Sequence, residues 1–78
     1  NSQTLIQFDL PRASDVTFSV YNILGKIVYQ RTQYYPGGRH DLVWDGRSMS
    51  GRDAATGIYF YRLKAGTFTS TKKMILLR

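Results

Sequence analysis

The sequence predicts an all-β protein, an antiparallel sandwich of about seven short strands. Apolar residues recur at every second position, which is the period of a half-buried strand and not of a helix. Turn-forming residues separate these runs at intervals of roughly 8–12 residues. No stretch of the 78 residues supports an amphipathic helix of useful length, and a chain of this length forms one domain at most.

The first half of the chain carries two runs in which apolar residues alternate with polar ones. Their apolar positions are Ile6, Phe8, Leu10, Val16, Phe18 and Val20. Each run is predicted to be a half-buried strand. Residues 21–26 form a connection in which Asn22 and Gly25 suit turn positions, with Gly25 available for a positive φ angle. A third strand over 27–32 is expected to pair with the second as a hairpin.

A cluster of turn-forming residues over 35–38 separates the third strand from a fourth. On the fourth strand one face carries His40, Leu42 and Trp44. Asp45 and Gly46 end this strand, because an aspartate before a glycine favours an Asx-type turn. The fourth strand is therefore expected to bring a large aromatic residue, Trp44, into the core.

The last part of the sequence predicts a β-hairpin. Residues 48–56 are polar and small, and form either a loop or a short hairpin of their own. Strands are predicted over 58–64 and 67–77, because both runs are rich in β-branched and aromatic residues. Ala65 and Gly66 between them are the expected two-residue turn.

A tyrosine near the start of the penultimate strand is typical of immunoglobulin-like sandwiches, in which its hydroxyl group bonds back to the upstream backbone. This pattern predicts that the core and its corner are built from Trp44, Gly57, Tyr59 and Tyr61, with Leu63 also pointing inward. The opposite face is assigned Ile58, Phe60 and either Met74 or Leu76. The run 74–77 is apolar on both sides, so either a neighbouring loop covers it or it forms an exposed docking patch.

The chain is basic, with 11 Lys and Arg against five acidic residues and a net charge of +6. Such a charge allows contact with nucleic acid, anionic membrane surfaces or acidic glycans. The basic residues are scattered, however, and only Lys72 and Lys73 are adjacent, so we interpret them mainly as solubilising residues and expect no nucleic-acid binding. No apolar run approaches the roughly 20 residues of a transmembrane segment.

The residues needed for common enzyme chemistry are sparse, and no enzymatic activity and no cofactor are expected. The sequence has one histidine and no cysteine. Ser14, His40 and Asp41 are present, but neither a nucleophile elbow nor an oxyanion loop surrounds them. Asp45 and Asp53 flank one loop, where a turn role is favoured over a weak calcium site.

An aromatic platform for sugar rings is an alternative use of three residues, Tyr29, Tyr34 and Tyr35. Tyrosine is also common in strands for structural reasons. A carbohydrate-binding or subunit-binding accessory module of the immunoglobulin-like type is therefore kept as the second hypothesis.

Several motifs, in this order and spacing, resemble one known family. They are Asn1 to Thr4, Phe8 to Pro11, Val20 to Gly25, Trp44 to Arg47, Gly57 to Leu63 and Lys72 to Leu77. The family is the C-terminal sorting domain of proteins exported by the type IX secretion system, whose close relative is the immunoglobulin-like domain of the flagellar hook-capping protein. The family often begins with Asn-Pro, whereas Ser2 replaces the proline here.

The resemblance implies that residues 1–78 are a single C-terminal domain excised from a larger secreted protein. Such a domain stays folded in the periplasm of a Gram-negative bacterium and is recognised by the outer-membrane secretion machinery. A cell-surface peptidase often removes it, and the cargo is released or attached to anionic lipopolysaccharide. The implied location is secreted or cell-surface. The last hairpin is the expected recognition element, through Lys72, Lys73, Met74, Ile75 and Leu76.

Overall fold

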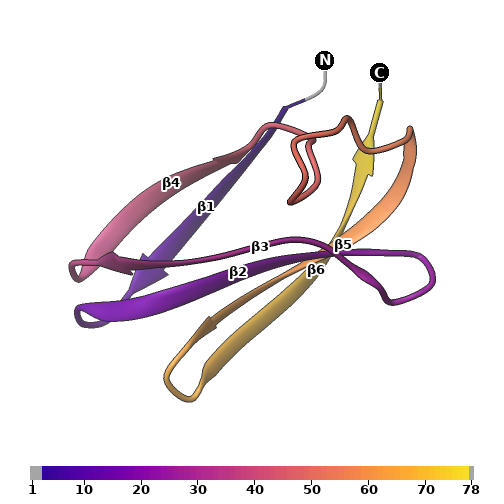
Figure 1. Ribbon diagram of the computed structural model, residues 1–78. Coiled ribbons are helices and arrows are strands. Elements are labelled where there is room, and N and C mark those ends of the chain that lie inside the picture. Colours follow the sequence, from indigo (N-terminus) through magenta and orange to yellow (C-terminus); the bar gives the residue numbers. More distant parts are fainter. Residues whose placement is uncertain (1–2, 78) are drawn as a thin grey trace.

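The computed structural model describes residues 3–77 as six antiparallel strands in two sheets (Figure 1). The strands are β1 (Thr4–Leu10), β2 (Ser14–Asn22), β3 (Ile27–Tyr35), β4 (Gly38–Trp44), β5 (Gly57–Ala65) and β6 (Phe68–Leu76). The expected all-β antiparallel fold is confirmed. Asn1, Ser2 and Arg78, which belong to the predicted motifs and chain ends, lie outside the described residues. No helix in the described part of the chain could cross a membrane.

The two sheets form the layers of a sandwich of unequal width. One sheet contains only β1 and β4, and the other has the order β3-β2-β5-β6. Alternating residues of both sheets meet between the layers, because successive side chains on a strand point to opposite faces. The buried core therefore includes Phe8 from β1, Trp44 from β4, Phe18 from β2 and Leu63 from β5.

The described residues form six strands where about seven were expected, and of the two alternatives for residues 48–56 the loop is the one that forms. The segment between β4 and β5 contains a single β-bridge, which joins Arg47 and Asp53. Ser48 and Arg52 share one backbone hydrogen bond of 2.8 Å inside it. Few large apolar residues lie in this segment, so it has little surface to bury as a strand. It remains a tight loop, and Ala54 is its one residue in the buried core.

The β2–β3 turn has the chemistry that the sequence predicts. The Oδ1 atom of Asn22 accepts hydrogen bonds from the backbone N–H groups of Leu24 and Lys26, each 3.0 Å long. Gly25 has a φ angle of 82°, a conformation that costs other L-residues energy. The asparagine and the glycine together fix this turn.

Two boundaries differ from the sequence-based expectations. Strand β3 continues to Tyr35 rather than ending at Thr32, because Tyr35 packs edge-on against Phe8 with ring centroids 5.1 Å apart. The β5–β6 turn consists of Gly66 and Thr67, one residue later than predicted. Gly66 has a φ angle of 59°, which suits the first position of a two-residue hairpin turn.

Candidate functional site

The final hairpin, formed by β5 and β6, contains all five residues expected to mediate recognition. Its register pairs Tyr59 with Met74 and Tyr61 with Lys72. Since cross-strand partners share a face, Met74 and Lys72 lie on the inner side of the sheet with the two tyrosines. Lys73 lies on the outer side.

The predicted placement of Met74 or Leu76 on the outer face is wrong for both. Met74 is buried and Leu76 is only 1% exposed, and both belong to the core cluster. Met74 and Leu76 lie opposite Tyr59 and Gly57, so the register of the hairpin places both side chains on the inner face of the sheet. Ile75, between them, is 61% exposed. The run 74–77 is thus covered on one face and open on the other.

The outer face of the final hairpin carries a small exposed cluster that we call the outer patch. It consists of Ile58, Phe60, Lys73 and Ile75. Ile58 pairs directly with Ile75, and Phe60 pairs with Lys73. A cation therefore borders three exposed apolar side chains, an arrangement that can dock an apolar surface with acidic groups at its edge.

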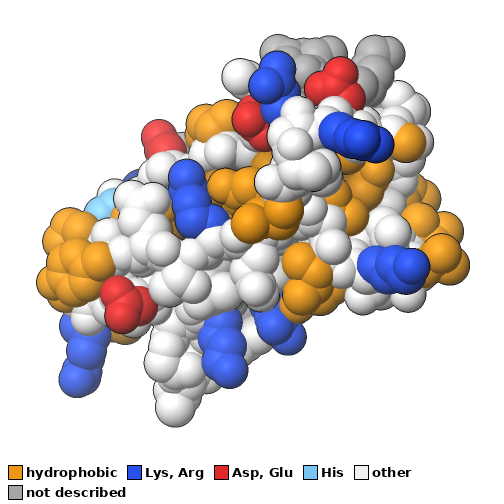
Figure 2. All heavy atoms as spheres, viewed as in Figure 1, with side chains coloured by type: hydrophobic (Ala, Val, Ile, Leu, Met, Phe, Trp, Pro, Cys, Tyr) orange, Lys and Arg blue, Asp and Glu red, His pale blue; other side chains and the backbone are white. Residues whose placement is uncertain are grey.

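A second cation, Arg62 of β5, borders the outer patch and lies over the neighbouring strand β2. Tyr21 of β2 pairs with Phe60, and the guanidinium of Arg62 lies 5.5 Å from the centroid of the Tyr21 ring. Elsewhere the basic residues are dispersed. Figure 2 shows Lys and Arg side chains spread over the visible face without one continuous basic area. The local pairing of cations with apolar residues, and not a basic field, distinguishes the outer patch.

The predicted tyrosine corner is present and fixes the start of the hairpin. The hydroxyl group of Tyr59 donates a 2.6 Å hydrogen bond to the carbonyl oxygen of Ala55. Its ring packs edge-on against Trp44, with centroids 5.7 Å apart. The indole Nε1 of Trp44 donates to the carbonyl oxygen of Arg47 at 3.0 Å. These contacts hold the β4–β5 loop against the core.

Two other residues assigned to the corner behave differently from each other. Tyr61 points inward as predicted and packs against Phe18 with centroids 5.9 Å apart, and its partial burial raises the pKa of its hydroxyl group. Gly57 has no positive φ angle, and nothing lies within 4 Å of the Cβ that a substitution would add. Nothing in the structure requires glycine there.

A comparison with protein-family models matches residues 2–77 to the CHU_C type IX secretion signal domain. This chain belongs to the family of type IX secretion signal domains. A secretion signal domain is a non-catalytic kind of domain. A search of the curated proteins finds no match to the chain.

Among solved structures the signal domain is similar to FlgD from P. aeruginosa. The TM-score is 0.74 and the sequence identity is 23%. The match covers 95% of this chain and 59% of the FlgD chain. At this identity the likeness supports the sandwich fold alone, and this chain spans little more than half the length of its structural relative.

The three tyrosines of the carbohydrate hypothesis are not brought together in the signal domain. Tyr29 packs against Phe18 on the inner face, with centroids 6.1 Å apart, and Tyr35 is buried against Phe8. Tyr34 points outward and is 63% exposed. Because strand residues alternate between faces, neighbouring tyrosines cannot share one platform. The sugar-stacking surface of the alternative hypothesis is therefore not formed by these three residues.

The polar residues considered for catalysis each have a structural contact instead. The His40 ring lies 5.0 Å from that of Tyr35, and its Nε2 donates a 2.6 Å hydrogen bond to the carbonyl oxygen of Pro36. The Ser14 hydroxyl donates to the carbonyl oxygen of Asp15 at 3.0 Å. Asp41 accepts a 3.1 Å bond from the Gln7 side chain.

The two aspartates considered for calcium lie at a turn and beside an arginine. Asp45 Oδ1 accepts a 3.1 Å hydrogen bond from the Arg47 N–H group, which confirms the predicted Asx turn. Asp53 lies 3.8 Å from the Arg47 guanidinium. Among residues 3–77 no group of three or more potential ligands gathers.

Sequence reasoning missed the contribution of Ile58 and Phe60 to the same surface as Lys73 and Ile75. It placed the first two residues outward but chose the recognition residues as one contiguous run. The register of the hairpin could have shown that these four residues share one surface. A two-residue turn fixes which residue of β5 lies beside each residue of β6.

Proposed function

We propose that this type IX secretion signal domain is a non-catalytic sorting module that directs a larger cargo protein through the outer-membrane translocon. The observation that carries the proposal is the family match over residues 2–77. The proposed route passes through the periplasm of a Gram-negative bacterium, and the cargo ends secreted or at the cell surface. Residues 1–78 form the C-terminal domain of that cargo in this proposal.

The outer patch is the proposed recognition surface for the secretion machinery. Lys73 and Ile75 belong to the predicted recognition run and are both exposed on the outer face. Phe60 and Ile58 beside them extend the apolar area. Exposed apolar side chains supply affinity on docking, and a neighbouring cation supplies orientation against an acidic partner.

Met74 and Leu76 have an indirect role in this proposal. Both are buried in the core, so they hold β6 in the register that exposes Lys73 and Ile75. Lys72 lies on the inner side of the sheet and does not belong to the outer patch. Deleting the whole segment 72–78 would remove core side chains as well as the recognition surface, so point substitutions make the sharper test.

The experiment uses a secreted reporter fused to residues 1–78 in a cell with a functional type IX system. The test variants are Ile75→Ser and Lys73→Glu. The matched control is Lys64→Glu, which makes the same charge change on the outer face opposite Thr69, away from the outer patch. Reporter is measured in the medium and in the periplasm, and circular dichroism of the purified domains checks that they fold.

The expected result is that both test variants remain folded and accumulate in the periplasm, while the Lys64→Glu fusion is exported normally. Undiminished export of the folded Ile75→Ser, Lys73→Glu double variant would contradict the outer patch as the recognition surface. Undiminished export of a fusion that lacks residues 1–78 altogether would contradict the sorting function itself.

Removal by a cell-surface peptidase and attachment of the cargo to anionic lipopolysaccharide are later steps of the same proposal. A cleaved cargo would lose the mass of the 9.0 kDa domain. Cargo attached to lipopolysaccharide would be found at the cell surface. On a denaturing gel it would then migrate as a heterogeneous band. A cargo of full-length mass in the medium would contradict both steps.

A further inference from the structure

The inner face of β6 is only partly covered, because two strands lie opposite four. The core residues Met74 and Leu76 at its end are buried. At its beginning, Phe68 is 46% exposed and Lys72 is also exposed, although both share the inward face with them. The facing sheet ends at β1, so it leaves the first half of β6 open.

A groove occupies this open position, and we call it the β1–β6 groove. Its volume is about 300 Å³, and its walls are Gln7, Phe8, Asp9, Tyr61, Leu63, Phe68, Ser70 and Lys72. The floor contains aromatic and aliphatic side chains, among them the half-buried Tyr61. Lys72 lies on one wall and Asp9 on the other.

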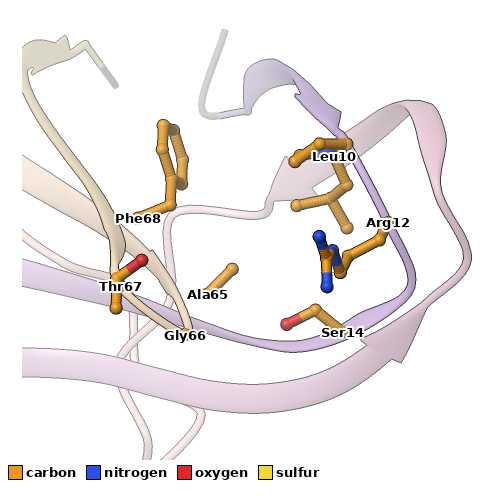
Figure 3. Close-up of a pocket in the computed structure, with 8 residues that line it drawn as sticks. Leu10, Arg12, Ser14, Ala65, Gly66, Thr67 and Phe68 are labelled. Carbon is orange, nitrogen blue, oxygen red and sulfur yellow. The ribbon is translucent and has the colours of Figure 1, made fainter.

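The groove continues at Phe68 into a second cavity of about 440 Å³ beside the β5–β6 turn. Figure 3 shows Phe68 on one side of this cavity, with the guanidinium of Arg12 and the hydroxyl of Ser14 pointing into it from the other. Leu10 adds an apolar wall. The two hollows form one extended path along β1, with a cation near each end.

Both strands that border the path are edge strands. In the described part of the chain, β1 pairs only with β4, and β6 pairs only with β5. The outer edge of an edge strand presents backbone N–H and C=O groups that can pair with an added strand. Such a strand beside β1 would lie over the uncovered inner face of β6 and complete a third strand of the smaller sheet.

The opposite edge of the large sheet shows that an uncovered inner face need not be apolar. On β3 the inward positions opposite Phe18 and Val16 are Arg31 and Gln33, and both are exposed. Polar side chains there are suited to water. On β6 the open inward positions are Phe68, opposite Ala65, and Lys72, opposite Tyr61. Among the described residues of the two edges, the one on β6 therefore leaves a large aromatic ring uncovered.

We propose that the β1–β6 groove accepts an extended segment of another polypeptide, added as a strand beside β1. The side chains of the added segment that point into the groove are apolar where they meet Phe68 and Tyr61. They are acidic at the two ends, where they meet Arg12 and Lys72. Asp9 is already paired with Arg39 at 3.5 Å, so the two cations decide the charge that is favoured. This surface is the reverse side of the final hairpin from the outer patch and extends beyond the proposed sorting function.

A second copy of this chain fits the groove less well. Each copy has a net charge of +6, so two copies repel each other. Lys72, an inward-facing cation on an edge strand, is a common device against pairing between identical edges. An acidic strand from a different protein meets neither obstacle.

The probe is a blocked peptide with the sequence Asp-Thr-Val-Thr-Val-Thr-Asp, whose roughly seven residues match the length of β1 at about 3.3 Å per residue. Its alternate residues place acidic groups at the ends and valines in the middle. One control peptide has lysine in place of both aspartates, and another has proline at the central threonine. Binding to residues 1–78 is measured by backbone NMR titration and by amide hydrogen exchange.

We expect chemical-shift changes confined to β1 and the first half of β6, and slower hydrogen exchange along β1. The lysine and proline peptides should each bind about tenfold more weakly or worse. Lys72→Glu should largely abolish the preference for the acidic over the lysine peptide, because Arg12 is then the one cation left among the described residues that line the path. The matched variant Lys73→Glu, one residue away on the other face, should leave the preference unchanged.

A linked version keeps the test decisive if the free peptide binds weakly. The peptide is joined to the N-terminus by a flexible linker of about ten residues, which raises its effective concentration to the millimolar range. The acidic peptide should then raise the melting temperature and the proline peptide should not. Equal melting temperatures or chemical-shift changes centred on the outer patch would each overturn the proposal. So would sedimentation that shows a dimer of the unliganded domain, if concentration-dependent shift changes place its interface in the groove.

Discussion

The hydroxyl group of Tyr59 is bonded to the carbonyl oxygen of Ala55 across 2.6 Å, four residues earlier in the chain. This bond fastens the end of the β4–β5 loop to the core. Trp44 fastens the beginning of the same loop, because its Nε1 donates to the carbonyl oxygen of Arg47. The two rings contact each other edge-on. One aromatic pair thus stabilises a loop that contains a single β-bridge.

The hydrogen bond between Tyr59 and Ala55 contributes to stability, so removing the Tyr59 hydroxyl oxygen should destabilise the domain measurably. Tyr59→Phe keeps the ring packing but leaves the Ala55 carbonyl without its side-chain partner, so unfolding free energy should fall by about 1–2 kcal/mol. Urea denaturation of the two proteins measures the difference. The control Tyr34→Phe, at an exposed position, should change stability by less than about 0.5 kcal/mol. Equal losses in both variants would contradict a special role for the corner.

Trp44 is predicted to be the most sensitive single side chain of the core. It is 1% exposed and is among the largest fully buried side chains. Trp44→Ala should cost about 3–5 kcal/mol, since a large cavity forms and the Arg47 carbonyl loses its donor. A domain of this size has about 5–10 kcal/mol in total, so the variant should be barely folded at room temperature. A loss below about 1 kcal/mol, measured by denaturant unfolding, would show that the core is assembled differently.

The core residues of β1 and β2 could be predicted from the sequence, because apolar and polar residues alternate along both strands and show which side chains point inward. In β1 and β2 the apolar residues stand at every second position, and all six predicted inward residues are buried. Ser19 is buried as well, on the opposite face, where its Oγ accepts a 2.9 Å hydrogen bond from the Gln30 side chain, and alternation does not predict this. The Tyr59 corner was equally accessible, since a tyrosine near the start of the penultimate strand follows a recurrent sandwich pattern. In these places local pattern and tertiary structure agree.

The faces of the last strand could not be predicted in the same way. The run from Met74 to Leu77 is apolar throughout, so alternation does not say which side is inward. The register with β5 decides it, because Met74 lies opposite the inward Tyr59. The unequal widths of the two sheets were also hidden, and with them the uncovered start of β6. Both features depend on strand order, which no local pattern contains.

Two glycines should respond differently to the same substitution. Gly66 has a φ angle of 59°, in the left-handed region, whereas Gly57 has no positive φ angle and open space around its Cβ position. Gly66→Ala should destabilise the domain by about 1–2 kcal/mol, since an L-residue is strained there. Gly57→Ala should change stability by no more than about 0.5 kcal/mol. Thermal unfolding of both variants tests the contrast, and a larger loss for Gly57→Ala would contradict it.

Stability at alkaline pH should depend on Tyr61. Burial raises the pKa of its hydroxyl group above the ordinary value of 10.0, because the ionised form is poorly solvated between the sheets. Below pH 10 the tyrosine is neutral in both folded and unfolded chains, and its contribution is fully present. As the pH rises from about 10 through the higher folded-state pKa, the unfolded chain ionises first and stability is lost. The comparison is with Tyr61→Phe, which removes this one hydroxyl group. Urea unfolding between pH 8 and roughly pH 11 should show a steeper decline for the unsubstituted domain than for the variant, and parallel declines would show that Tyr61 is solvated.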